Sequence, residues 1–209
     1  MPTCSWPPYL WRTRVGVLGP GLRAAIWVRG CPLRCRGCIS PEDLPFEGGT
    51  RWPVAVLAER LGGLPDEVSG VTFSGGEPTA QASALAALVR LLRRGRDWSV
   101  MSYMGYTIEY LRAHGDAAQR DLLGLLDILV DGPYLEHRHA DLLWRASDNQ
   151  SLHFLTSRHA RPAADVSAGL EIEASGPGLS WTGVPPVPGF RAAFEAAMRH
   201  EGVPLAVES

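Results

Sequence analysis

Short apolar strand patterns alternate with amphipathic helix patterns between residues 22 and 131, and this alternation constrains the fold more than any other feature. The strand patterns lie at 22–29, 69–73, 98–103 and 127–131, and the helix patterns lie at 53–62, 79–94 and within 107–125. Because parallel strands need crossover connections, the alternation predicts an α/β protein with a parallel sheet and helices packed outside it. A further apolar run at 151–155 is a candidate last strand.

The chain has 209 residues, enough for one domain and an appendage. We expect an N-terminal segment at 1–21, the alternating domain at 22–158 and a small C-terminal appendage at 159–209. In the appendage, residues 170–184 have the pattern of a β-hairpin and residues 188–201 that of a helix. The appendage is therefore predicted to be a hairpin plus a helix.

The composition excludes several classes of protein. Hydrophobic residues make up 45% of the chain and charged residues 20%, which is typical of a globular domain with a core. A net charge of −2 provides no broad basic surface for nucleic acid or an anionic membrane. No apolar run reaches the length of about 18 residues that spans a bilayer. We expect a cytoplasmic protein that binds neither nucleic acid nor membrane.

Three of the four cysteines lie in one short loop, Cys31-Pro-Leu-Arg-Cys35-Arg-Gly-Cys38, directly after the first strand. This spacing lets three thiolates converge on one metal centre. A cubane iron-sulfur cluster has four irons, so three cysteines leave one iron open to another ligand. Zinc is the alternative, with Cys4 or a histidine as the fourth ligand, although Cys4 lies 27 residues before Cys31 and is most simply a free thiol.

A second motif, Ser74-Gly-Gly-Glu-Pro78, follows the second strand. Its two glycines let the backbone approach a ligand closely, its proline sets the direction of the exit, and Glu77 can accept a hydrogen bond from an ammonium group. By itself the motif is typical of a strand-to-helix turn. Its position after the cysteine loop favours a ligand site.

The C-x3-C-x2-C loop and the Gly-Gly-Glu-Pro turn together resemble the signature of the radical S-adenosylmethionine (SAM) superfamily. The segment Leu18-Gly-Pro-Gly-Leu-Arg23 further resembles the opening of the glycyl-radical enzyme activases, in particular the activases of anaerobic (class III) ribonucleotide reductase. The similarity covers residues 14–155. Matching segments follow in the same order at 31–42, 45–49, 103–106, 131–134 and 143–150.

The resemblance implies a partial (βα)6-type barrel with the cofactors at the carboxyl ends of its strands. It implies that the ligands of a 4Fe-4S cluster are Cys31, Cys35 and Cys38, and that SAM binds the open iron. It assigns the methionyl part of SAM to the turn residues Gly75, Gly76, Glu77 and Pro78. Ser102 and Asp131 are candidates for the amino acid or ribose of SAM, because a carboxylate can accept two hydroxyl hydrogen bonds. Asp131 followed by Gly132 is equally typical of a simple turn.

The implied reaction is reductive cleavage of SAM to methionine and a 5′-deoxyadenosyl radical that abstracts hydrogen. Flavodoxin or ferredoxin is the expected kind of electron donor. In activases, the hydrogen comes from a backbone glycine of a larger glycyl-radical enzyme. Two alternatives stay open: a radical SAM enzyme that modifies a peptide or small metabolite, and a non-enzymatic zinc domain that recruits a partner through its appendage.

The chain departs from the family pattern at four positions. Leu18 replaces an aspartate, Ile39 and Ser40 follow the last cysteine where the family has an aromatic residue or histidine and then asparagine, and Met104 replaces a threonine. These positions leave the cluster and SAM residues intact, so they bear on partner and substrate. Three histidines near the end of the predicted barrel have no metal-binding spacing and are expected on the surface or in the core: His137, His139 and His153.

Overall fold

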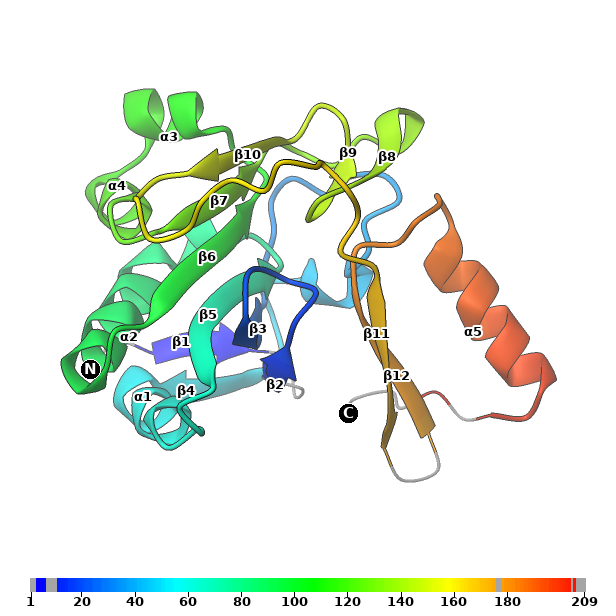
Figure 1. Cartoon of the computed structure of the whole chain (residues 1–209), viewed down its shortest axis with the longest axis horizontal. Helices are drawn as coiled ribbons and strands as arrows, with labels where there is room; N and C mark the ends of the chain where they lie inside the picture. The colour runs from blue at the N-terminus through cyan, green and yellow to red at the C-terminus, as the bar shows by residue number, and fades with distance from the viewer. Residues whose placement is uncertain (1–2, 7–10, 176–177, 204, 206–209) are drawn as a thin grey trace.

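The computed structural model describes residues 3–6, 11–175, 178–203 and 205. Its centre is a six-stranded sheet with the strand order β10-β7-β6-β5-β3-β2 (Figure 1). The strands are β2 (Trp11–Val15), β3 (Leu22–Val28), β5 (Val68–Gly75), β6 (Ser99–Met104), β7 (Ile128–Asp131) and β10 (Ser151–Phe154). Strands β3, β5, β6 and β7 are parallel, whereas β2 and β10 pair antiparallel at the two edges.

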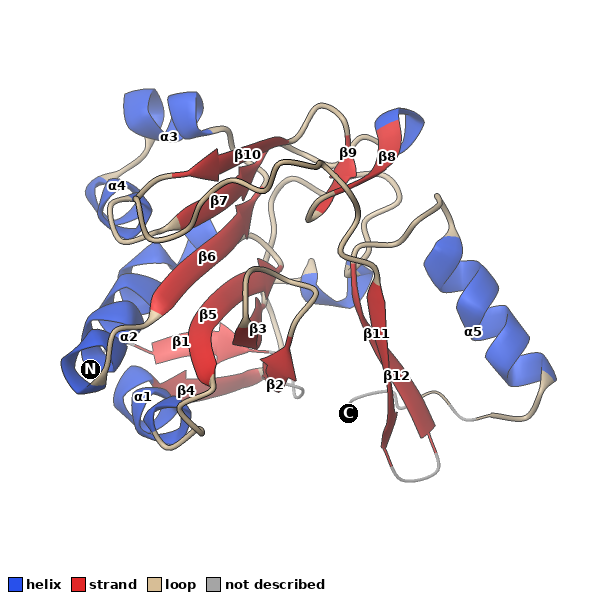
Figure 2. Cartoon of the chain, in the orientation of Figure 1, coloured by secondary structure: helices blue, strands red, loops and turns tan. Residues whose placement is uncertain are grey.

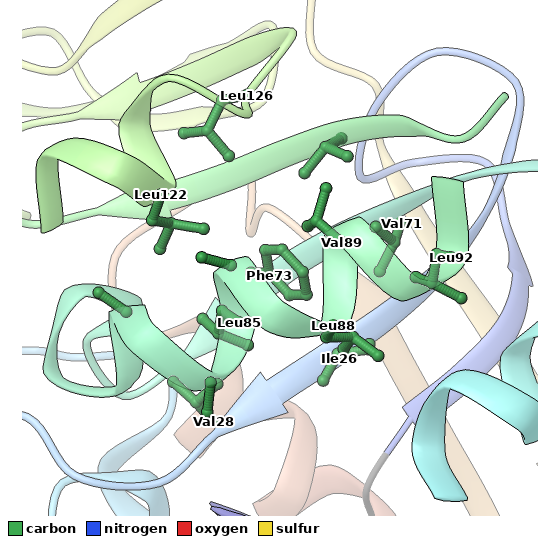
Figure 3. Packing of buried hydrophobic residues seen from close by; sticks show 14 of the residues in the cluster. Ile26, Val28, Val71, Phe73, Leu85, Leu88, Val89, Leu92, Leu122 and Leu126 are labelled. Atoms are coloured by element: carbon green, nitrogen blue, oxygen red, sulfur yellow. The ribbon is translucent and has the colours of Figure 1, made fainter. Parts of the chain in front are cut away.

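Helices connect the parallel strands and cover one face of the sheet. They are α1 (Val54–Gly62), α2 (Ala82–Gly95), α3 (Ile108–His114) and α4 (Ala117–Leu123). Figure 3 shows the apolar side of α2, with Leu85, Leu88 and Val89, packed in one cluster with Phe73 of β5. Each such fully buried side chain contributes about 1.5–3 kcal/mol of transfer free energy. This packing holds the parallel strands in register, with their carboxyl ends at one edge.

The predicted α/β class and the predicted order of strands and helices are confirmed. The barrel of six βα units is not confirmed, because the described residues form no closed barrel and contain four parallel strands. Between β7 and β10 the chain forms a small hairpin, β8 (His139–Leu142) and β9 (Arg145–Ser147), in place of a crossover helix. Without such a crossover, β10 returns beside β7 in the opposite direction.

The remaining elements lie outside the parallel unit. Near the N-terminus, β1 (Thr3–Trp6) pairs with β4 (Thr50–Pro53). The predicted C-terminal hairpin and helix are present as β11 (Leu170–Ser175), β12 (Gly178–Gly183) and α5 (Phe190–His200), with residues 176–177 outside the described residues. Figure 2 shows the hairpin between the central sheet and α5. Over the described part of the chain, no helix is long and apolar enough to cross a membrane.

Candidate functional site

A cavity of about 470 Å³ lies where the four parallel strands end. Its walls come from the loops that follow β3, β5, β6 and β7, and from the C-terminal segment between β12 and α5. Ligands of open α/β sheets bind at this place because the carboxyl ends of several strands bring their loops together there. The cavity is therefore the candidate cofactor site.

All three cysteines of the predicted loop line this cavity. Cys31 follows β3 and is buried, whereas Cys35 and Cys38 are half-buried. Backbone hydrogen bonds shape the loop: Cys31 N donates to Leu44 O (3.0 Å), and Cys38 N donates to Cys35 O (3.2 Å). Three sulfur donors at one cavity fit the ligand chemistry of an iron-sulfur cluster.

The surroundings of the loop raise the pKa of two of its thiols. Burial raises the pKa of Cys35, and the neighbouring Cys31 raises it further. Burial also raises the pKa of Cys38. Metal binding releases these protons, because the ligand is the thiolate. Within the described residues, no three His, Cys, Asp or Glu side chains are arranged to hold a single ion; the side chain of Cys4, a fourth ligand in the zinc alternative, lies outside those residues.

The Gly-Gly-Glu-Pro turn is fastened to the strand end that leads into the cysteine loop. Gly76 N donates to Val28 O (2.7 Å), and Glu77 N donates to Gly30 O (2.9 Å). Gly75 has φ +89°, and a Cβ on Gly76 would lie 2.5 Å from Gly30 O. Larger residues would therefore push the two segments apart. The turn and the cysteine loop form the floor of one site.

Glu77 is buried at this floor, with 1% of its surface exposed. One carboxylate oxygen accepts from the backbone N–H (3.0 Å) and hydroxyl (2.7 Å) of Thr79, and the other accepts from Gly105 N (2.7 Å). Burial raises the pKa of Glu77, and these hydrogen bonds oppose that effect. Because a carboxylate has roughly four acceptor positions, Glu77 keeps capacity for one further donor. Pro78 is buried, starts the next helical turn and does not line the cavity.

Two predicted residues lie apart from the cavity lining. Ser102 is fully buried on β6, and its hydroxyl is 3.4 Å from Tyr103 O. Asp131 is 2% exposed at the end of β7, accepts a hydrogen bond from Ile108 N (2.6 Å) and lies 3.1 Å from His153 Nε2. The carboxylate of Asp131 thus anchors the first residue of α3. The prediction that these two side chains contact SAM gains no support from this placement.

Two polar residues that were not predicted as site residues, Tyr103 and His139, line the cavity. The Tyr103 hydroxyl and His139 Nε2 are buried and have no hydrogen-bond partner among the described residues. The other ring nitrogen of His139 lies 3.1 Å from the Tyr134 hydroxyl, which orients the ring. Buried polar atoms without partners are costly, so these two atoms are candidates for a contact with a polar ligand. His139 is one of the three histidines that were expected on the surface or in the core. The spacing of these histidines in the sequence does not indicate a ligand site.

The departures from the family pattern lie around the same site. Leu18, Ile39 and Met104 line the cavity. Ile39 and Leu18 also line a neighbouring cavity of about 570 Å³, together with Ser40. The positions at which this chain differs from the pattern are therefore part of the cavity walls.

Comparison with known proteins agrees with this geometry. The 4Fe-4S single cluster domain family matches residues 17–153. Anaerobic ribonucleoside-triphosphate reductase-activating proteins are similar to the chain. Those of Vibrio cholerae and Pasteurella multocida are 32% and 34% identical over 148 and 149 residues, in both cases 67% of this chain and 92% of the relative. The protein of Escherichia coli is 30% identical over 148 residues, 66% of this chain and 92% of the relative.

Fold, cysteine loop and family match define a 4Fe-4S single-cluster protein. More narrowly, the chain belongs to the radical SAM family of anaerobic ribonucleoside-triphosphate reductase-activating proteins.

Proposed function

We propose that this protein is a radical SAM activating enzyme that generates a glycyl radical in a larger partner enzyme. The observation that carries the proposal is that the three cysteines and residues 75–77 line one cavity in a chain of this family. The relatives named above are activating proteins of anaerobic ribonucleoside-triphosphate reductase. A reductase of that type is therefore the partner that we propose.

Cys31, Cys35 and Cys38 would hold the 4Fe-4S cluster and leave one iron for SAM. When bound and reduced by a flavodoxin or ferredoxin, the cluster supplies an electron that breaks a carbon–sulfur bond of SAM, which gives methionine and a 5′-deoxyadenosyl radical. The chain's own residues bind and orient the cofactors.

The turn after β5 would bind the methionyl part of SAM. Gly75 and Gly76 present backbone without side chains, and Glu77 has acceptor capacity for the ammonium group. The Tyr103 hydroxyl and His139 Nε2 are the lining groups available for the remaining polar atoms of the cofactor or substrate. The cavity is also lined by the apolar residues Leu33, Met104 and Trp144. These side chains exclude water from the cavity, which protects a reactive radical.

The first test is anaerobic reconstitution with iron and sulfide, followed by electron paramagnetic resonance of the dithionite-reduced protein with and without SAM. We expect the signal of a reduced 4Fe-4S cluster, and we expect SAM to change it. Stoichiometric zinc with no iron uptake would instead support the zinc alternative and overturn the proposal.

The second test adds the partner. The reconstituted protein, SAM and an anaerobic ribonucleoside-triphosphate reductase are mixed under reducing conditions, and the glycyl radical and 5′-deoxyadenosine are measured together. We expect both products. SAM cleavage without a glycyl radical on any such reductase would favour the alternative of a peptide or small-metabolite substrate.

A further inference from the structure

The cofactor cavity has an outer wall that is built from the C-terminal appendage. Its lining includes Val184, Pro188, Phe190 and Arg191, in the same cavity as the three cysteines. Figure 1 shows α5 on the far side of the hairpin from the central sheet. The appendage thus reaches back over the cofactor site although it lies far from the cysteine loop in the sequence.

This outer wall lies outside the region that the chain shares with its family. The family match ends at residue 153. The match to the Vibrio cholerae relative takes in 92% of that protein but 67% of this chain, so this chain carries residues that the relative does not match. The outer wall therefore lies outside the part of the chain that the family model matches.

Helix α5 is packed on its own hairpin and not into the core. It has no fully buried residue. The Phe190 ring contacts Trp181 of β12 edge to face at 5.4 Å and stacks on Phe194 at 5.7 Å. The hairpin in turn is tied to the loop after β2, where Gly16 N donates to a Glu171 carboxylate oxygen (2.8 Å), and to β2 through Arg12 and Glu173 (3.8 Å). The appendage is therefore a small unit whose position over the cavity depends on a few contacts.

Arg191 links this unit to the cysteine loop. Its Nη1 donates to Ile39 O (2.7 Å) and lies 2.6 Å from a carboxylate oxygen of Glu42. Its Nε donates to Glu195 one helical turn later (2.8 Å), which helps to fix the orientation of the guanidinium. The side chain is 32% exposed, so water screens these contacts only in part. A planar guanidinium suits this arrangement because it can donate to three groups at once.

The strap between β12 and α5, residues 184–189, is stiff. Its sequence Val-Pro-Pro-Val-Pro-Gly contains three prolines, each with a fixed φ. The fixed φ angles of these prolines limit the conformations open to the segment between Gly183 and Gly189, the two positive-φ glycines at its ends.

We propose that residues 184–195 are a specificity wall for the substrate, and that Arg191 is the positioning residue that holds this wall against the cysteine loop. The inference rests on the function proposed above and concerns the same site. While Arg191 contacts Ile39 and Glu42, the wall narrows the opening that leads from solvent to the three cysteines. When this contact is lost, α5 moves away from the cysteine loop and larger groups can enter the cavity.

The test measures access to the cysteines of the full-length apoprotein under reducing, anaerobic conditions. Alkylation rates at Cys31, Cys35 and Cys38 are compared for N-ethylmaleimide and for a maleimide on a long, neutral polyethylene glycol chain, with each cysteine scored by peptide mass spectrometry. Both reagents react through the same maleimide group, so the ratio of their rates cancels changes in thiol reactivity. The ratio reports the width of the path.

We expect Arg191→Ala to raise the ratio of large-reagent to small-reagent rates about tenfold. The variant removes a charge-assisted contact that stabilises the closed position of α5, and this loss shifts the equilibrium toward the open position. Arg191→Lys keeps the charge and should restore part of the restriction. Arg199→Ala is the matched control on the same helix, with a side chain 67% exposed, and should leave the ratio unchanged.

Glu42→Gln weakens the link from the loop side without altering α5, and it leaves the hydrogen bond to Ile39 O in place. It should raise the ratio as well, by less than Arg191→Ala does, and the double variant should not exceed Arg191→Ala by much, because Arg191→Ala already removes the contact with Glu42. An unchanged ratio in both single variants would overturn the proposal. So would a raised ratio in Arg191→Ala with lost helical circular dichroism and no effect of Glu42→Gln. None of these results alters the cluster signal that tests the proposed function.

Discussion

The carboxylate of Glu77 accepts a hydrogen bond from the backbone N–H of Gly105 at 2.7 Å, which joins the turn after β5 to the loop after β6. Both loops line the cofactor cavity. The same carboxylate is held from its other side by Thr79. Glu77 is therefore rigid before any ligand arrives, and its orientation costs no entropy on binding.

Glu77→Gln should weaken SAM binding to the reconstituted protein by at least about tenfold, since it removes one charge-assisted hydrogen bond. The amide keeps the size of the side chain but presents an N–H2 group to one of the present donors. Equilibrium binding of SAM is the measurement, with iron content as the check that the cluster is retained. Glu59→Gln, exposed on α1, is the control. Equal SAM affinity in both variants would contradict the role proposed for Glu77.

Replacing any cysteine of the loop by alanine should abolish the cluster and SAM cleavage while the protein still folds. Each thiol is one of three proposed ligands, and none of the three cysteines belongs to the main apolar core cluster. Iron and sulfide content and the yield of 5′-deoxyadenosine are measured for each variant. Cys4→Ala is the matched control and should keep its iron; the side chain of Cys4 lies outside the described residues. An undiminished 5′-deoxyadenosine yield in Cys35→Ala would refute the ligand assignment.

Arg23→Met should lower the free energy of unfolding by about 3 kcal/mol, because it leaves buried acceptors without a donor. Arg23 is fully buried at the start of β3, and burial lowers its pKa to about 10. Its guanidinium donates to the Thr72 hydroxyl (2.7 Å) and to carbonyls that include Val71 O (2.8 Å). Urea unfolding measures the loss. Arg90→Met removes an exposed ion pair and should change stability little; a similar loss in both would show that the buried network is not the cause.

Acidification should destabilise the protein partly through His159. Burial lowers the pKa of His159, and the nearby Arg23 lowers it further; its Nε2 lies 2.7 Å from the Ser99 hydroxyl. The unfolded chain then binds a proton at a higher pH than the native protein does, so stability falls as the pH drops below the ordinary value of 6.5. His159→Asn should flatten this slope in unfolding measurements from about pH 7.5 to about pH 5.5. His200→Asn, at an exposed position, should not. If the dependence of the unfolding free energy on pH is unchanged in His159→Asn, groups other than His159 cause the loss of stability in acid.

The sequence by itself determined the order of strands and helices from β3 to β7, the position of the three cysteines directly after a parallel strand, and the turn that carries Glu77. These features depend on local information. Apolar periodicity shows which side of an element is buried, and glycine and proline show where the chain turns. The C-terminal hairpin and helix were predicted on the same basis.

Tertiary structure alone decided the partners of each element and the side on which each residue lies. The chain pairs β10 antiparallel to β7, and it directs the Asp131 carboxylate to the start of α3 rather than into the cavity. It also brings His139 and Arg191 to the cofactor site from segments that no motif connects with it. Strand direction and contacts across the chain depend on how distant apolar surfaces are buried together, and local patterns do not encode that choice.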